Sequence, residues 1–348
     1  MTPNNELNKR IIKNITENEF VLSPKIPRNR FLIELSNICN HKCIFCANKK
    51  MTRKKGDINP EFLNRILDEA YNEGVREVGF YTTGEPLASK NLVPAIKQAK
   101  QLGYEYIYIT TNGALATEEK VIPVIKAGID SIKFSINAGD EKTYKLIHGK
   151  DDFNIVKENL KFVYNYRKDN NLDYKIFISF VITTYTINQV EEFKKEFKPY
   201  CDDIIFADMI NQGGWNSEKE NTLKTNVRNN DILSVTLKLP CMDVFNSLTV
   251  TKEGYLTACC VDFENQLAIA DLNKMSLKEG WNCDKFQKLR QAHLDKNVRG
   301  TICHNCISYS REKFSPINEQ LATPIDFDKL YNDEWIQNSI DDFLKERS

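Results

Sequence analysis

The sequence predicts an α/β protein with a parallel sheet, followed by a smaller cysteine-rich unit. Two observations lead to this prediction. Six strand-like segments alternate with helical patterns between residues 31 and 210, and the alternation stops at 211–214, beyond which a second group of cysteines starts at Cys241. Strands that alternate with helices form parallel sheets with the helices outside, and such folds bind ligands at the carboxyl ends of the strands. A chain of 348 residues has room for about two domains.

Each expected element has a local signal. A short apolar run that ends at Ser36-Asn37 predicts the first strand, at 31–35. Asn59-Pro60 predicts a helix start, apolar residues follow at helical spacing, and Gly74 ends that helix. The alternation then continues with strands at 78–81, 106–109, 132–136, 176–182 and 204–210, and with helices at about 91–103, up to 128, at 153–166 and at 188–197.

The cysteine-rich unit has weaker signals. Segments 247–251 and 255–258 predict a hairpin that turns at Gly254, and one helix is expected near the C-terminus. The expected units are a lead-in at 1–30, the strand–helix unit at 31–212, a polar linker at 213–240, the cysteine-rich unit at 241–310 and a tail at 311–348.

Composition narrows the class of protein. The chain has 48 basic and 48 acidic residues. It therefore has no bulk positive field, and we expect no nucleic-acid partner. No apolar run reaches about 18 residues and the N-terminus lacks the apolar core of a signal peptide, so we expect no membrane partner and a cytoplasmic protein. Ten cysteines in a reducing compartment are not expected to form a disulfide framework, and their spacing has to explain them.

The first cysteine group consists of Cys39, Cys43 and Cys46, just past the first expected strand. Three thiolates on one short loop can hold three irons of a [4Fe–4S] cluster and leave the fourth iron free for a substrate or cofactor. The alternative is a zinc site with His41 as the fourth ligand. Four ligands within eight residues would be cramped, which favours the cluster.

Residues 39–46 (Cys-Asn-His-Lys-Cys-Ile-Phe-Cys), with the aromatic Phe45 before the third cysteine, resemble the motif of the radical S-adenosylmethionine (radical SAM) superfamily. Residues 83–86 (Thr-Gly-Glu-Pro) resemble the family's Gly-Gly-Glu-Pro motif, which holds the amino group of the SAM methionine. A carboxylate and carbonyl acceptors suit an ammonium group, and a glycine lets the backbone approach. Thr83 stands in place of the first glycine of the motif.

Two more segments resemble the family, and each follows an expected strand. Residues 110–113 contain a Thr-Asn-Gly turn, and within residues 134–139 Ser135 and Asn137 resemble residues that contact the SAM ribose and carboxylate. The resemblance covers about residues 31–210 and implies a partial (β/α)6 TIM barrel. It also implies a SAM-binding [4Fe–4S] cluster and a set of SAM contacts, namely Phe45, Thr83, Gly84, Glu85, Asn112, Ser135 and Asn137.

The resemblance implies a mechanism as well. The cluster, reduced by an external one-electron donor such as flavodoxin or ferredoxin, cleaves SAM to methionine and a 5′-deoxyadenosyl radical. That radical abstracts a hydrogen atom from an unactivated carbon. The cofactor carries this chemistry, while the barrel positions it and excludes water.

The second cysteine group consists of Cys241, Cys259, Cys303 and Cys306. With Gly254 between the first two, its pattern resembles the SPASM/twitch extension of radical SAM enzymes. Only four cysteines fit, which favours the shorter twitch form with one fully ligated auxiliary [4Fe–4S] cluster, and such a cluster is suited to electron transfer. The alternative is a structural zinc ion held by the same four cysteines.

Three further residues are candidates for catalysis. Cys260 lies next to an expected ligand, where it either packs beside the cluster or donates a hydrogen atom to a substrate radical, as in radical epimerases. Asp262 and His148 are candidate substrate contacts or proton acceptors, and each also has a plainer structural interpretation.

The leading hypothesis is a twitch-type radical SAM dehydrogenase that oxidises a small polyol, aminocyclitol or sugar-like alcohol. The cysteine layout supports it, and so does an N-terminal segment too short for a peptide-recognition domain. The second hypothesis is a peptide-modifying enzyme: an epimerase that uses Cys260, a cross-linking maturase or a sulfatase-type maturase. The third is a non-catalytic iron–sulfur or zinc protein, for which the SAM-like motifs would have no purpose.

Overall fold

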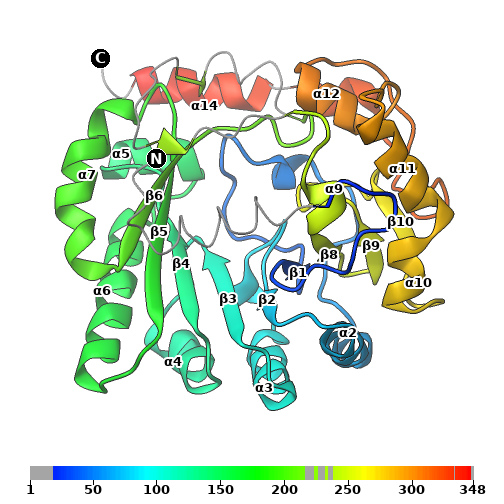
Figure 1. Ribbon diagram of the computed structural model, residues 1–348. Helices are drawn as coiled ribbons and strands as arrows, with labels where there is room; N and C mark the ends of the chain where they lie inside the picture. Colours follow the sequence, from blue (N-terminus) through cyan, green and yellow to red (C-terminus); the bar gives the residue numbers. More distant parts are fainter. Residues whose placement is uncertain (1–18, 216–222, 226–231, 234–237, 333, 346–348) are drawn as a thin grey trace.

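The computed structural model describes residues 19–215, 223–225, 232–233, 238–332 and 334–345. In this part of the chain the strands form one sheet in the order β10-β9-β8-β1-β2-β3-β4-β5-β6-β7, with β10 and β7 at its two edges (Figure 1). Residues 1–18 of the expected lead-in, most of the expected linker at 213–240 and residues 346–348 lie outside the described residues.

The parallel sheet predicted from the alternation is confirmed, and it does not close into a full barrel. Each strand from β1 to β6 pairs in parallel with the next, and β7 pairs with β6. The bounds are β1 (Phe31–Ile33), β2 (Glu77–Gly79), β3 (Tyr106–Thr111), β4 (Ser131–Ser135), β5 (Lys175–Ile182), β6 (Asp203–Asp208) and β7 (Ile232–Leu233).

Helices connect these strands along the outer face of the sheet (Figure 1). The first begins as predicted, because the Asn59 side chain accepts a hydrogen bond from the Phe62 amide and Pro60 follows it. The connecting helices are α2 (Pro60–Asn72), α3 (Leu92–Leu102), α4 (Glu118–Lys126), α6 (Phe153–Asp169) and α7 (Val190–Phe197). Short 3-10 turns lie at η1 (Ala47–Lys50), η2 (Pro86–Ala88), η3 (Ile187–Gln189) and η4 (Lys198–Tyr200).

One helix near the first cysteine group was not predicted. Helix α5 (Glu141–His148) starts where the Asp140 carboxylate accepts a hydrogen bond from the Thr143 amide at 2.8 Å, and Gly149 with φ of 64° ends it. Its last residue, His148, is thereby carried to the cysteine loop.

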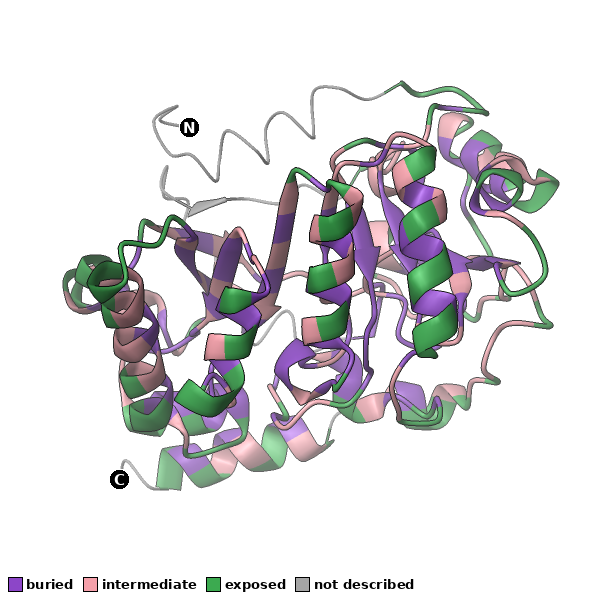
Figure 2. Cartoon of the chain, turned by 90° about the horizontal axis from the view of Figure 1, so that it is seen from below, coloured by how far each residue is buried: buried purple, intermediate pink, exposed green. Residues whose placement is uncertain are grey.

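Burial alternates along the strands. In β3, Ile107, Ile109 and Thr111 are buried, whereas Tyr106 and Tyr108 are only half-buried. Figure 2 shows the flanking helices with buried residues toward the strands and exposed residues on the outside. Burial of the apolar side chains of both layers supplies the main driving force for this arrangement.

The predicted hairpin is present, and it extends the barrel sheet. Strand β8 (Leu248–Val250) pairs in parallel with β1, β9 (Tyr255–Thr257) pairs antiparallel with β8, and β10 (Ala268–Asp271) pairs antiparallel with β9. Gly254 permits the turn, because its φ of 85° is a conformation that other residues rarely adopt. The cysteine-rich unit is therefore joined to the barrel through main-chain hydrogen bonds.

Helices make up much of the rest of this unit and of the tail that follows it. They are α9 (Asp243–Asn246), α10 (Leu277–Asn282), α11 (Asp284–Leu294), α12 (Ile302–Ser308), α13 (Phe327–Leu330) and α14 (Glu334–Lys345). The last is the predicted terminal helix. It lies across the top of the molecule in Figure 1 and packs against α5. None of the described helices is long and apolar enough to cross a membrane.

Candidate functional site

The first cysteine group lies on the loop that joins β1 to η1, at the carboxyl end of β1. Burial raises the pKa of Cys39 to about 12 and that of Cys43 well above its ordinary value. The neighbouring thiols Cys46 and Cys39 raise the pKa of Cys43 further. Without a metal these thiols stay protonated, and iron would supply the positive charge that thiolate formation needs. The donor set therefore fits an iron–sulfur cluster.

Two histidines, His41 and His148, lie in contact with each other at this loop. The Nε2 atom of His41 lies 3.1 Å from the Asp152 carboxylate, and the Nδ1 atoms of His41 and His148 lie 3.2 Å apart. His148 Nδ1 also lies 3.6 Å from Cys43 Sγ, and its Nε2 atom lies 3.3 Å from the Asn137 amide. His148 is only 1% exposed, and burial lowers its pKa well below the ordinary value. The structure thus places His148 against the cysteine loop, and its role as a substrate contact stays a prediction.

Glu85 ties together the ends of two strands. One carboxylate oxygen accepts hydrogen bonds from Thr111 Oγ1 at 2.7 Å and from the Leu87 amide at 3.0 Å, and the other accepts from the Asn112 amide at 2.8 Å. Burial raises the pKa of Glu85. Two carboxylate oxygens offer about four acceptor positions, so the carboxylate keeps room for a further donor such as an ammonium group.

Gly84 packs directly on the segment that leads to Cys39. A Cβ atom at this position would lie 2.2 Å from the Ser36 carbonyl oxygen and 2.8 Å from that of Ile38. The Glu85 amide donates to the same Ile38 carbonyl at 2.8 Å. Only glycine fits here, so the Thr-Gly-Glu-Pro segment and the cysteine loop are held at a fixed separation.

The other expected SAM contacts gather at neighbouring strand ends. Asn112, just past β3, donates to Asn40 Oδ1 at 2.8 Å and reaches Cys39 Sγ at 3.9 Å. Asn137, just past β4, donates to Ser135 Oγ at 3.2 Å and accepts from the Val181 amide at 2.8 Å. Phe45 lies half-buried on the cysteine loop itself. The structure therefore brings the seven expected SAM contacts together at the carboxyl ends of β1 to β4.

The second cysteine group comes together from three segments. Burial raises the pKa of Cys241 to about 12, with Cys306 among the further causes, and burial followed by Cys241 and Cys306 raises the pKa of Cys303. Cys259, which follows β9, and Cys241 both lie near Asp243. Sequence positions more than 60 residues apart are thereby placed around one site.

Cys260 and Asp262 lie beside this group. The Cys259 thiol donates a hydrogen bond to Cys260, which raises the pKa of Cys259 and lowers that of Cys260. Asp262 accepts from Thr257 Oγ1 at 2.8 Å and from the amides of residues 266 and 267 at 2.7 and 2.9 Å. Asp262 therefore holds the turn between β9 and β10, and catalytic roles for both residues stay predictions.

The spacing of the sulfur atoms bears on the zinc alternatives. Within the described residues, the one set of three or more His, Cys, Asp or Glu ligand atoms that all lie within 4.8 Å of one another is His41, Cys43 and His148. Sulfurs on a single zinc ion lie about 3.8 Å apart, because Zn–S bonds are about 2.3 Å long. In the described residues no three sulfurs of the second group all lie within 4.8 Å of one another, so they are less tightly gathered than ligands of one zinc ion, which suits the larger cluster.

Family models match both parts of the chain. The radical SAM superfamily model matches residues 33–197, and the model of an iron–sulfur cluster-binding domain, SPASM, matches residues 241–307. The chain belongs to the radical SAM superfamily and carries a SPASM domain. The two domains indicate [4Fe–4S] clusters and SAM as cofactors, in agreement with the cysteine geometry described above.

Curated relatives match this chain over part of its length. An uncharacterised protein of Methanocaldococcus jannaschii is 31% identical over 199 residues, 57% of this chain and 62% of that protein. A probable GTP 3′,8-cyclase of Saccharolobus islandicus is 34% identical over 138 residues, 39% of this chain and 43% of that protein. The chain thus spans less than two thirds of the length of these relatives.

Solved radical SAM structures share the fold at low identity. BtrN in complex with AdoMet and 2-DOIA is 18% identical, with a TM-score of 0.50, and the match covers 76% of this chain and 85% of BtrN. Streptococcus suis SuiB bound to precursor peptide SuiA is 16% identical, with a TM-score of 0.60 and coverage of 81% and 70%. AnSMEcpe with bound AdoMet is 15% identical, with a TM-score of 0.56 and coverage of 90% and 98%.

Sequence reasoning did not single out Glu34 and Arg53, which form a buried ion pair beside the SAM motif. A signal for Glu34 was present, because it follows the apolar residues of β1 in the run Phe-Leu-Ile-Glu-Leu. A carboxylate buried with such a strand needs a partner. Which cation pairs with it is decided only by the fold.

Proposed function

We propose that this radical SAM protein dehydrogenates a small alcohol, aminocyclitol or sugar-like substrate. The observation that carries the proposal is the second cysteine group, because a single cluster with all four irons ligated would need four such thiols. Conversion of an alcohol to a carbonyl removes a hydrogen atom from carbon, a proton from the hydroxyl and one further electron. When bound, the SAM-site cofactors supply the hydrogen abstraction, and a separate one-electron acceptor must take the remaining electron.

The pairing of the hairpin with the barrel sheet supports such an acceptor. Strand β8 pairs with β1 in register, with Phe31 opposite Leu248 and Ile33 opposite Val250. The first cysteine group follows β1, and Cys259 of the second group follows β9 of the same sheet. Electron transfer needs a short and constant separation of donor and acceptor, and a shared sheet supports this better than a flexible linker would. The likeness to BtrN, whose structure contains 2-DOIA, adds support at the level of the fold.

The iron content of a triple variant tests this proposal. Replacement of Cys39, Cys43 and Cys46 by alanine, with purification in the absence of oxygen, should leave about four irons per chain on the second group. A matched variant with Cys201 replaced by alanine should keep both clusters, because that buried thiol donates only to the Phe197 and Lys198 carbonyls. A triple variant that holds no iron, or one zinc ion, would remove the electron acceptor and contradict the proposal.

A second candidate is peptide modification. It is supported by the TM-scores of 0.60 with SuiB bound to its precursor peptide and 0.54 with AnSMEcpe bound to AdoMet and the Cp18Cys peptide. The variant Cys260→Ala distinguishes a dehydrogenase from a peptide epimerase. An epimerase that uses this thiol would still form 5′-deoxyadenosine but lose its product, whereas a dehydrogenase would keep its product.

A further inference from the structure

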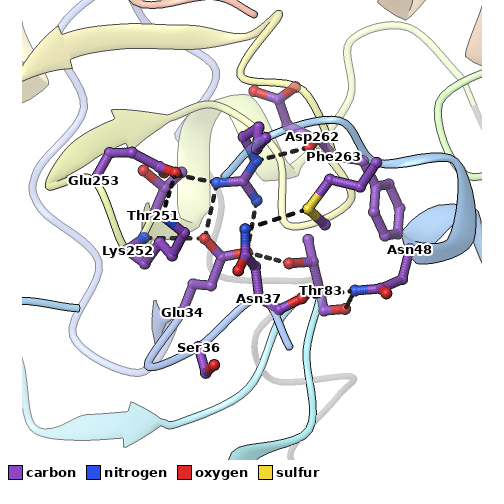
Figure 3. Close-up of polar contacts among 12 residues, drawn as sticks. Glu34, Ser36, Asn37, Asn48, Thr83, Thr251, Lys252, Glu253, Asp262 and Phe263 are labelled. Carbon is purple, nitrogen blue, oxygen red and sulfur yellow. Dashed lines mark hydrogen bonds and ion pairs between the residues drawn. The ribbon is translucent and has the colours of Figure 1, made fainter. Parts of the chain in front are cut away.

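A buried ion pair lies between the cysteine loop and the SPASM domain (Figure 3). Arg53 donates to both carboxylate oxygens of Glu34, at 2.9 and 2.7 Å, and both side chains are 2% exposed. Glu34 directly follows β1, and Arg53 follows η1, so the pair closes the loop that carries the first cysteine group. Removal of one partner would leave the other charge buried and uncompensated.

The SPASM domain completes the surroundings of this pair. Arg53 Nε donates to the Phe263 carbonyl at 2.7 Å, and Arg53 Nη1 also donates to Glu253 at 2.7 Å. The Lys252 amide donates to Glu34 at 3.0 Å. Burial acts to lower the pKa of Arg53, but Glu34 and Glu253 raise it above its ordinary value. The guanidinium therefore stays charged and spans the two domains.

A second carboxylate from the SPASM domain holds the same stretch of backbone. Glu264 accepts hydrogen bonds from the amides of Thr52 and, at 3.2 Å, of Arg53. Contacts from two pairs of neighbouring residues, 252 with 253 and 263 with 264, thus fix where Arg53 and Glu34 lie. Figure 3 shows Lys252 and Glu253 on one side of Glu34 and Thr83 on the other.

The other side of Glu34 faces the SAM motif. The Thr83 hydroxyl donates to Glu34 Oε1, and the Thr83 carbonyl accepts from Asn48 Nδ2 at 2.6 Å. Thr83 is the residue that departs from the glycine of the superfamily motif, and it is 7% exposed. In this chain the departure creates a hydrogen bond between the SAM motif and the ion pair. A buried threonine hydroxyl without a partner would be costly.

We propose that Glu34 and Arg53 are positioning residues for SAM, and that the SPASM domain strengthens SAM binding through them. The chain of contacts runs from Glu253 through Arg53 and Glu34 to Thr83, whose carbonyl lies in the segment that receives the SAM ammonium group. The inference concerns SAM binding and is independent of which substrate the enzyme oxidises.

The contact between Thr83 and Glu34 is tested by measuring the SAM dissociation constant of the reconstituted holoenzyme. Thr83→Val keeps the shape and removes the hydroxyl, so it should raise the dissociation constant about tenfold, the effect of losing one hydrogen bond to a charged group. Thr83→Ser restores the hydroxyl and should bind SAM within threefold of the unmodified protein. Thr143→Val is the matched control, because Thr143 is also buried and its hydroxyl donates to a carboxylate, Asp140, at 3.0 Å.

The contribution of the SPASM domain has its own variant. Glu253→Gln should weaken SAM binding at least threefold and raise the SAM concentration needed to change the electron paramagnetic resonance spectrum of the reduced cluster. Iron content should not change. Unaltered SAM affinity in both Thr83→Val and Glu253→Gln would overturn the proposal, as would a serine variant as weak as the valine variant. If Thr83→Val loses iron, Glu253→Gln decides, because it lies outside the cysteine loop.

Discussion

Replacement of Gly84 by alanine is the sharpest steric test of the SAM site. Gly84 is not among the glycines with positive φ, so an added methyl group would be opposed by contact alone and not by backbone conformation. The new Cβ atom would lie 2.2 Å from the Ser36 carbonyl oxygen and 2.8 Å from that of Ile38. Ordinary carbon–oxygen contacts are about 3.3 Å or longer. One of the two backbone segments would therefore have to move by about 1 Å.

That displacement has two measurable consequences. Overpacking of this kind costs about 1–3 kcal/mol of unfolding free energy. A shift of about 1 Å in a positioning segment costs about a hundredfold in rate. We therefore expect the reduced, anaerobic Gly84→Ala enzyme to form 5′-deoxyadenosine about a hundredfold more slowly.

A neighbouring glycine provides the control. An added Cβ atom at Gly56 would meet nothing within 4 Å, and the Gly56 amide donates to Asn37 Oδ1 at 2.9 Å, within the segment 36–38 that Gly84 contacts. Gly56→Ala should retain both the rate and the stability. If Gly84→Ala retains the rate within threefold while folding normally, the close contact with residues 36–38 does not position the SAM motif.

Two further outcomes are expected in the SPASM domain. Asp262→Ala removes the acceptor for three hydrogen bonds in the turn after β9 and should lower the free energy of unfolding by about 3 kcal/mol or more, measured by urea denaturation. An unchanged free energy would contradict the structural role of Asp262. The second outcome concerns the pH dependence of stability. Burial raises the pKa of Glu253, but Arg53 and Lys252 lower it by more, so that the pKa lies below its ordinary value of 4.5. Its stabilising contribution is therefore complete above pH 4.5 and is lost as the pH falls toward the lower folded-state pKa, so acid should destabilise Glu253→Gln less steeply than the unmodified protein. Parallel acid denaturation curves of the two proteins would contradict this.

Local patterns in the sequence were sufficient for the main architecture. The strand–helix alternation predicted the parallel sheet, because the periodicity of buried side chains is a property of each segment. Cys39, Cys43 and Cys46 are close in the chain, so their spacing alone indicated that they ligate one cluster. The hairpin around Gly254 was predicted for the same reason. Helix α5 was missed, although Asp140 at its start and Gly149 at its end are typical helix start and stop residues.

Tertiary structure decided how the two domains meet. Pairing of β8 with β1 joins residues more than 200 positions apart, and no local pattern specifies which strand edge a distant hairpin will extend. The same holds for Arg53, whose partners come from β1, the hairpin and the turn after β9. Sequence patterns alone predicted the cluster ligands and the strand ends at which they lie. The positions of these groups relative to one another depend on long-range pairing, because burial and hydrogen bonding of charged groups are satisfied only once distant segments have come together.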